Sequence, residues 1–269
     1  MAATDTSTIS ASELAKPARK LSGPLGEVGS FFVLSLQILV QMFHLPFAWR
    51  EFISQSWFVA RVSLVPAMTV SIPFNTLAIF IINILLTEIG AADLAGTGAS
   101  LATVVYIGPL GTVVIVAGTG ATAMSADLGA RTIREELDAM KVMGVDPVQA
   151  LLVPRVLALT LNAVMLNAVT TIIGLLTNYV FSVYFQHVTP GAFATSLTLL
   201  VGLKDVAIAF GKAAVFGLLA GLVACYKGTT VGGGAQGVGN AVNETVVFAF
   251  LALFVVNVAL TAVTTKATM

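Results

Sequence analysis

The sequence predicts an all-α polytopic membrane protein: an N-terminal interfacial helix, five transmembrane helices and one charged cytoplasmic helix. Apolar residues make up 57% of the chain and charged residues only 10%, whereas a soluble domain carries roughly 25% charged residues. Such a chain cannot cover a water-facing surface. Five apolar runs have about the 20 residues needed to cross the hydrocarbon core. Because backbone groups in lipid must be bonded internally, these runs are helices and not open sheet.

The N-terminal part is expected to hold a disordered cytoplasmic stretch over 1–27 and an interfacial helix over 28–50. The first twenty residues end in a basic cluster of Lys16, Arg19 and Lys20. The apolar stretch after them carries a polar stripe that is typical of a helix lying in the interface plane, namely Ser30, Gln37, Gln41 and His44. A signal peptide is the alternative, but no small-residue cleavage site follows the apolar stretch.

The five transmembrane helices are expected over 62–86, 99–124, 148–183, 206–226 and 242–263. The third is long enough to tilt or to project beyond the bilayer. Cytoplasmic loops carry an excess of Lys and Arg, which places the basic N-terminal cluster, Arg50 and Lys227 on the cytoplasmic side. Five spans then leave the C-terminus outside, and Lys266 is a mild objection to that placement.

A charged island separates the second and third spans. The chain has 13 basic and 13 acidic residues, and nine of them fall between Asp127 and Arg155. A charged segment between two spans must lie in water, where it can touch a soluble partner. Ile133, Leu137 and Met140 fall at i, i+4 and i+7, which predicts one apolar helix face. The alternative is a solvated helix that only joins two spans.

The ends of this helix also have sequence signals. Arg131 with Glu135, and Arg134 with Asp138, have the i,i+4 spacing of helical ion pairs. Gly144 is placed to stop the helix. Asp146-Pro147 then has the pattern of an N-cap followed by proline at the first position of the next helix.

Glycine patterns carry little functional information in this chain. Gly232, Gly234 and Gly237 match G-x-G-x-x-G, but no strand precedes them, so a flexible turn is expected in place of a dinucleotide site. No G-x-x-x-x-G-K-[ST] motif occurs, so the chain is not expected to bind ATP by that route. Gly217 and Gly221 form a GxxxG pattern, which predicts close helix packing.

The polar residues of the spans do not predict an enzyme. Lys212 is expected to bond a helix end or reach an interface, with a substrate contact as the alternative. His44 and His187 lie in different regions without partner ligands, so no metal site is supported, and no nucleophile has a nearby base. The single cysteine, Cys225, is expected to be a small buried hydrophobe. A net charge of zero argues against nucleic-acid binding.

The charged island resembles the signature of the MlaE/YrbE family, the permease subunits of Mce-type ABC lipid transporters. The resemblance covers roughly Val62 to the C-terminus and suits an actinobacterial YrbE-like member. In the island it rests on Asp127-Leu128-Gly129, Glu135 to Met140, Met143 to Pro147 and Val153-Pro154-Arg155. Outside the island it rests on Ile107-Gly108-Pro109, Ala117-Gly118, Lys212, Phe216-Gly217, Gly237-Val238-Gly239 and Val246-Val247.

The resemblance implies that Arg131–Gly144 is a coupling helix seated in a groove of a separate ATP-hydrolysing subunit. The residues that would contact this ATPase are Ile133, Arg134, Glu135, Glu136, Leu137, Asp138, Met140 and Lys141. ATP and Mg²⁺ would bind to the ATPase, and this chain would hold no cofactor.

The resemblance also implies the setting of the transporter. An MlaE-like domain over 51–269 would lie in the inner (plasma) membrane with a cytoplasmic N-terminus. It would pair with a second YrbE-type subunit, as a homodimer or heterodimer, and dock onto Mce proteins on the outer face. Lipids or fatty acids would be imported. The residues expected to line their cavity are Ile72, Ile79, Phe80 and Asn83.

Three positions depart from the family pattern. Val105-Tyr106 stands where many members have Arg-Glu, and Thr119 where many have Arg. These replacements remove charges from the second span, which puts in doubt any ionic contact made there. Two other functions remain open from the sequence: an ATP-independent lipid carrier or channel, and a membrane scaffold that anchors Mce-type proteins.

Overall fold

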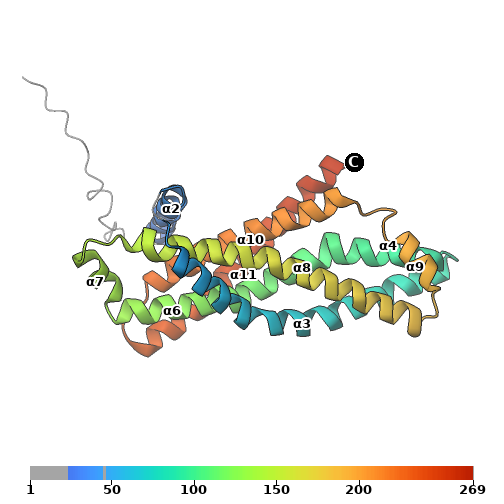
Figure 1. Cartoon of the computed structure of the whole chain (residues 1–269), viewed down its shortest axis with the longest axis horizontal. Helices are drawn as coiled ribbons and strands as arrows, with labels where there is room; N and C mark the ends of the chain where they lie inside the picture. Colours follow the sequence, from blue (N-terminus) through green and yellow to red (C-terminus); the bar gives the residue numbers. More distant parts are fainter. Residues whose placement is uncertain (1–23, 45–46, 269) are drawn as a thin grey trace, which may run out of the picture.

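The computed structural model describes residues 24–44 and 47–268, which fold into helices that run mostly along one long axis (Figure 1). In chain order these are α2 (Pro24–Gln41), α3 (Trp49–Glu88), η1 (Ala92–Leu94), α4 (Ala95–Ser100), η2 (Leu101–Ile107), α5 (Gly108–Ile115), η3 (Val116–Ala121), α6 (Thr122–Ile133), α7 (Glu136–Val142), η4 (Val148–Leu152), α8 (Val153–Tyr184), α9 (Pro190–Ser196), α10 (Leu203–Thr229) and α11 (Gly234–Thr268).

Five helical stretches of the described chain are long and apolar enough to cross a membrane, which confirms the predicted all-α fold with five spans. They are Trp49–Glu88, Ala92–Ile133, Val148–Tyr184, Leu203–Thr229 and Gly234–Thr264. Most of them extend beyond the predicted apolar runs. Hydropathy marks the part that suits the hydrocarbon core, whereas the backbone hydrogen bonds continue into more polar sequence at the ends.

The N-terminal helix begins and ends at other residues than the sequence predicted. Helix α2 ends at Gln41, residues 42–44 leave the helix, and α3 begins at Trp49. The expected helix over 28–50 is therefore too long at its C-terminal end, where Pro46 in the sequence disfavours helical continuation. The expected disordered stretch lies outside the described residues as far as residue 23, and its last four residues belong to α2.

Helix α3 packs along α8 through a single narrow row of side chains. The eight buried residues of α3 are all four positions apart: Gln55, Val59, Ser63, Ala67, Ser71, Asn75, Ile79 and Asn83. A row with this spacing is one i±4 ridge, which fits into a groove of a neighbouring helix. Several members are small, and small side chains allow close helix approach in lipid.

Helices α8 and α10 approach each other closely at the predicted GxxxG pattern. A Cβ atom added at Gly217 would lie 2.6 Å from the Thr160 Cα atom, and one at Gly221 would lie 3.1 Å from the Val156 Cα atom. Both distances are to backbone: there is no room for a Cβ atom at Gly217, and at Gly221 the neighbouring helix would have to give way by a few tenths of an ångström. The prediction of a helix-packing face is confirmed.

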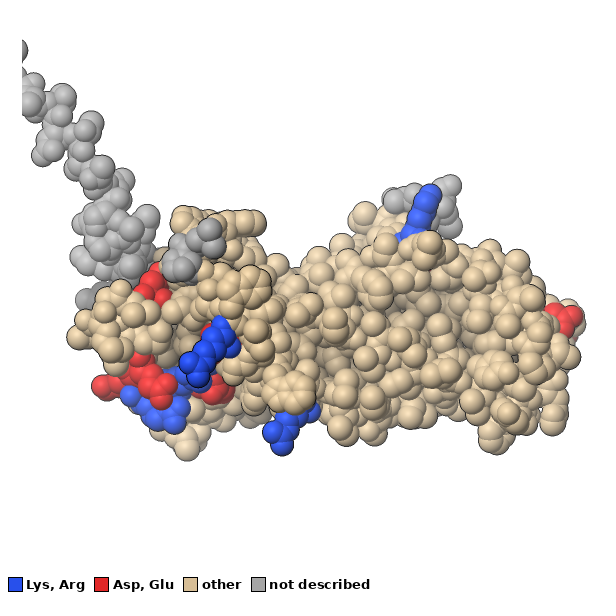
Figure 2. Space-filling view, in the orientation of Figure 1, with Lys and Arg blue, Asp and Glu red and all other residues tan. Residues whose placement is uncertain are grey.

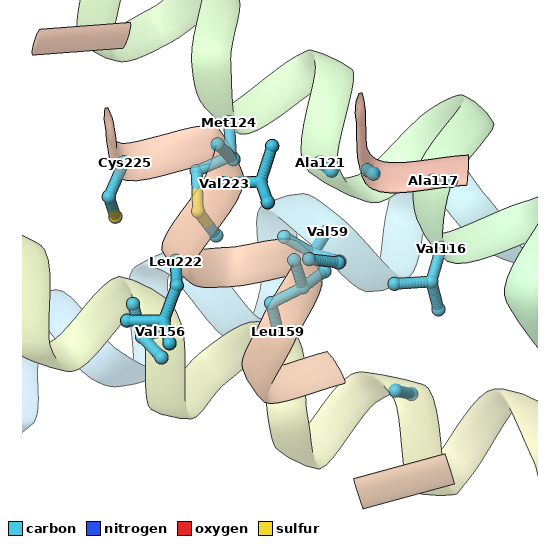
Figure 3. Packing of buried hydrophobic residues seen from close by; sticks show 14 of the residues in the cluster. Val59, Val116, Ala117, Ala121, Met124, Val156, Leu159, Leu222, Val223 and Cys225 are labelled. Carbon is cyan, nitrogen blue, oxygen red and sulfur yellow. The ribbon is translucent and has the colours of Figure 1, made fainter. Parts of the chain in front are cut away.

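The main core lies where α3, η3, α6, α8 and α10 meet (Figure 3). Val59, Leu159 and Met124 are fully buried there, and their side chains converge between the helices. Cys225 is a free, fully buried cysteine of the same cluster, as the sequence predicted. This core connects the long spans to the end of the molecule that carries α7.

Two outer spans leave broad apolar faces uncovered. Helix α11, like α3, buries one row spaced by four: Ala241, Thr245, Ala249 and Leu253. Large apolar side chains such as Leu77 on α3 and Val255 on α11 are more than 60% exposed. Faces of this extent suit lipid or another membrane subunit, not water.

Candidate functional site

Charged side chains gather at one end of the elongated molecule, which we call the charged end (Figure 2). This end carries α7 and the adjoining ends of α6 and α8, and the middle of the visible face is almost free of charge. At the opposite end, α9 packs on α4, where the Thr97 hydroxyl donates to the Ser196 carbonyl over 2.6 Å. The charged end is therefore the part of the described structure best suited to a water-soluble partner.

The charged island is not one continuous helix. Helix α6 ends at Ile133, Glu135 adopts a left-handed conformation with φ of 58°, and α7 begins at Glu136. The predicted Arg131–Gly144 helix is wrong in this respect. A left-handed non-glycine residue costs roughly 1–2 kcal/mol. Glutamate is a good helix former, so the sequence around Glu135 does not predict the break.

The break changes the ion pairs. The expected Arg131–Glu135 and Arg134–Asp138 pairs are not among those that the described residues form. Glu136 instead receives Arg134 at 2.9 Å and Arg131 at 3.7 Å. Arg131 also donates to Asp127 over 3.2 Å. Glu136 can serve both arginines because the left-handed residue turns α7 away from the axis of α6.

The expected contact residues are divided between two short helices. Leu137 on α7 is buried, Met140 is half-buried, and Ile133 lies on α6 and is exposed. The remaining polar members are exposed or half-buried: Arg134, Glu135, Glu136, Asp138 and Lys141. Lys141 and Asp138 pair across 2.8 Å on the surface of α7. The island therefore presents a charged surface, and the three apolar residues do not share one helix face.

The sequence did not predict an apolar tip at the C-terminal end of α7, formed by its last residue and the turn that follows. Val142 is 90% exposed and Met143 is 71% exposed, and Val145 follows them in the turn. Exposed apolar residues at the end of a charged helix are candidates for burial against a protein partner. A signal was present in the sequence, because these are apolar residues inside a charged island and outside its apolar periodicity.

The turn after α7 has the predicted chemistry. Gly144 has φ of 79° and ends the helix. The Asp146 carboxylate accepts a hydrogen bond of 3.0 Å from the Val148 backbone N–H, and Pro147 follows the cap. The same carboxylate accepts the side-chain amide of Gln41 over 2.8 Å. The turn is therefore joined to the end of α2.

Helix α2 is fixed to the bundle at a second place. The Tyr226 hydroxyl of α10 donates to the Glu27 carbonyl over 3.1 Å and lies 2.8 Å from the Ser30 hydroxyl. The Phe31 ring packs edge-on against Tyr226. Phe32 and Leu36 on α2 are each 65% exposed. An apolar face on a helix held against a bundle end in this way is typical of an interfacial helix.

The four residues expected to line a lipid cavity occupy different faces of α3. Ile79 and Asn83 are buried in the bundle, whereas Ile72 and Phe80 are about half exposed. Asn83 donates to the Ser182 hydroxyl over 2.8 Å and also bonds Gln186. The structure therefore does not bring the four side chains together on one surface.

Most buried polar groups of the spans bond neighbouring helices. Thr103 donates to Asn75 over 2.9 Å and accepts from Asn178 over 2.8 Å, which joins α3, η2 and α8. Lys212 is buried and donates to the Thr261 hydroxyl of α11 over 3.1 Å. Within the described residues no three His, Cys, Asp or Glu side chains are placed to hold a metal ion.

The departures from the family pattern lie in two π-helical segments. Val105 and Tyr106 belong to η2, and the Tyr106 side chain is 51% exposed. Thr119 belongs to η3 and donates to the Ser63 hydroxyl of α3 over 2.8 Å. At Thr119 a helix–helix hydrogen bond therefore stands at a position where the family pattern has a charge.

Comparison with known proteins identifies the architecture. A family model described as the permease MlaE matches residues 52–263, a range that takes in α7 and nearly the full length of the five spans. This chain belongs to the MlaE permease family. It is accordingly a membrane protein of the ABC transporter permease type, as the resemblance of the charged island predicted.

Individual relatives agree with the membership. A probable ABC transporter permease protein of Rickettsia bellii is 28% identical over 87% of this chain and 90% of its own length. A probable ABC transporter permease protein of Synechocystis is 34% identical over 46% of this chain and 48% of its own. The chloroplast protein TRIGALACTOSYLDIACYLGLYCEROL 1 of Arabidopsis thaliana is 28% identical over 46% and 35%. The chain spans about half the length of most of the relatives that it matches.

Proposed function

We propose that this MlaE-family chain is the membrane subunit of an ABC transporter that moves lipids or fatty acids, and that it hydrolyses no ATP itself. The observation that carries the proposal is the charged end. Helix α7 and its apolar tip lie between the second and third spans of an apolar bundle. A soluble ATPase seated on this end could drive the spans, which explains why a membrane protein concentrates its charges there.

The proposal places α7 in the cytoplasm as the coupling helix. The exposed charges of Glu135, Asp138 and Lys141 would make the polar contacts, and Val142 and Met143 would be buried by the ATPase. ATP and Mg²⁺ would bind to that ATPase. The N-terminus would be cytoplasmic and the C-terminus external, in the inner (plasma) membrane.

The uncovered apolar faces support a partner within the membrane. One narrow row attaches each of α3 and α11 to the rest of the chain, and the outer side of each is apolar. A second YrbE-type subunit would cover part of these faces. The lipid would pass along the exposed side of α3, where Ile72 and Phe80 lie. Mce proteins would dock at the end that carries α9, and transport would be import.

A charge reversal on α7 tests the ATPase contact. We expect Glu135→Lys with Asp138→Lys to leave membrane insertion and abundance unchanged, because both side chains are exposed. Like charges at a complementary interface cost several kcal/mol, so the ATPase should be lost from the purified complex. Transport of a fluorescent phospholipid in phosphatidylethanolamine–phosphatidylglycerol proteoliposomes should stop with it.

The matched control reverses two exposed acids at the opposite end, Glu88→Lys with Asp93→Lys, and should retain the ATPase. An α7 variant that keeps its ATPase and transports at the normal rate would reduce α7 to a hydrated connector. Phospholipid movement by the purified chain without any ATPase would indicate an ATP-independent carrier. A chain that binds outer-face proteins and moves no lipid would be a scaffold.

A further inference from the structure

Arg155 is a fully buried guanidinium at the start of α8, held by two carboxylates from other helices. Its Nη2 atom lies 2.6 Å from the Asp127 carboxylate of α6 and 3.3 Å from the Glu51 carboxylate of α3. The side chain of Arg155 is 0% exposed, whereas its partners are 32% and 26% exposed. A buried charge depends on its partners far more than an exposed one does.

These two contacts belong to a longer series of ion pairs that reaches α7. The Asp127 oxygen that accepts Arg155 also accepts the Nε of Arg131 at 3.2 Å. Arg131 in turn contacts Glu136, the first residue of α7, at 3.7 Å. We call Glu136, Arg131, Asp127, Arg155 and Glu51 the ion-pair series. It connects α7 to α6, α8 and α3 without interruption.

Two single atoms form the junctions of the ion-pair series. One carboxylate oxygen of Asp127 serves both Arg131 and Arg155, and one nitrogen of Arg155 serves both Asp127 and Glu51. A movement of α7 that draws Arg131 outward therefore acts directly on the oxygen that holds Arg155. Because Arg155 is buried, it has to follow that oxygen or form a new pair.

Arg155 has the means to form a second arrangement. Its Nε and Nη1 atoms are buried and have no hydrogen-bond partner among residues 24–44 and 47–268. A guanidinium can hold a carboxylate with two parallel hydrogen bonds, whereas here each carboxylate receives only Nη2. These unused donors would allow Arg155 to reorient and bind one carboxylate through two hydrogen bonds when the other carboxylate moves away.

We propose that Arg155 is a positioning residue that passes the displacement of α7 to α3 and α8 through the ion-pair series. The inference rests on the proposed function, since it needs an ATPase that moves α7. Its chemistry is a switch of buried ion pairs between two geometries. The exposed pair of Lys141 and Asp138 lies outside the series and would take no part in it.

The experiment interrupts the ion-pair series on either side of Arg155. Asp127→Asn and Glu51→Gln each remove one carboxylate and leave Arg155 the other, so the fold should survive. In the purified complex, ATP hydrolysis should stay within about twofold of the unaltered protein, the size of an ordinary surface change. The fluorescent phospholipid moved per ATP should fall by at least about fivefold in both variants, the low end of site-to-site coupling.

Asp127→Glu is the rescue variant, because it restores a carboxylate to the junction, and it should recover most of the coupling. Glu244→Gln is the matched control. It loses a carboxylate from a pair of 2.6 Å with Lys227 that lies outside the series, and its coupling should be normal.

Normal coupling in both Asp127→Asn and Glu51→Gln would overturn the inference. A parallel loss of ATP hydrolysis, transport and complex assembly would also overturn it, because that result describes a structural clamp. Failure of the proposed function would be seen in the unaltered chain, which would bind no ATPase or move no lipid. That result would refute both proposals. Uncoupling in both variants with rescue by Asp127→Glu establishes the role.

Discussion

Replacing Gly217 with alanine tests how closely α10 and α8 must approach. The added Cβ atom would lie 2.6 Å from the Thr160 Cα atom, 2.7 Å from the Ala163 Cβ atom and 2.8 Å from the Leu159 carbonyl oxygen. Ordinary contact of a Cβ atom begins at 3.4 Å. Two of the three obstacles are backbone, so no rotamer change relieves them, and the helices must separate by about 0.8 Å at this point.

Overpacking of this kind typically costs about 1–3 kcal/mol. In a membrane the separated helices remain helical, so the higher helix propensity of alanine offsets little of this cost. We expect the apparent Tm of the detergent-solubilised chain to fall by about 2–4 °C for each kcal/mol lost, the usual scale for chains of somewhat smaller size. Fluorescence-detected size-exclusion chromatography after heating measures the shift.

The same helix supplies a graded series of controls. Gly221→Ala meets its nearest backbone atom at 3.1 Å and should lower the Tm less than Gly217→Ala, and Gly211→Ala meets nothing within 4 Å. Gly211 is exposed, so its replacement by alanine measures the effect of helix propensity without any change in packing. The packing argument is refuted if Gly217→Ala is as stable as Gly211→Ala, or if the order of Gly217 and Gly221 is reversed.

Two further outcomes are expected. Glu135→Gly should raise the hydrogen-exchange protection of residues 136–142 by roughly 0.5–1 kcal/mol, because glycine accepts φ of 58° without the left-handed penalty. Ala139→Gly inside α7 should lower it by about 1 kcal/mol, and equal effects of the two changes would contradict the helix break. In intact cells an impermeant maleimide should label Leu200→Cys but not Thr230→Cys, because these exposed positions lie at opposite ends and Cys225 is buried. Labelling of both would contradict the proposed topology.

The spans and the caps of the charged island could be predicted because their causes are local. A run of apolar residues identifies a span regardless of its neighbours. Gly144 and Asp146-Pro147 act through their own backbone and side-chain chemistry, and both are found as predicted. The GxxxG pattern of Gly217 and Gly221 also held, since a glycine pair on one helix face has few uses other than close approach.

The break at Glu135 and the ion-pair series could not be predicted, because their causes are tertiary. Arg134 and Glu135 favour a helix by propensity, whereas Glu135 is left-handed and α7 packs beside α6. Arg155 pairs with Asp127 and Glu51, which are 28 and 104 residues away in sequence. Spacing along one helix carries no information about such partners.

The packing rows of the outer spans were hidden for another reason. On α3 the buried positions recur every fourth residue from Gln55 to Asn83, and most of them are small or polar within an otherwise apolar helix. Hydropathy averaged over a span does not register that row. The four residues expected to line the cavity therefore share α3 but not one side of it, because the buried row divides them between the bundle interior and the exposed face.

The attachments of α3 indicate how a force at the charged end would reach the apolar body. Along its length α3 is held by neutral groups, such as the hydrogen bond of Asn75 with Thr103 and that of Ser63 with Thr119. The only ion pair that α3 makes within the described residues joins Glu51 to Arg155, in its first turn. A helix of 40 residues is about 60 Å long, so a tilt of α3 about a point near its first turn would displace the far end more than the first turn. Since a single narrow row holds α3 against α8, a tilt of α3 would disturb fewer contacts than a movement of the doubly packed α8 or α10. Helix α3 is thus the span whose position would respond most to the ion-pair series.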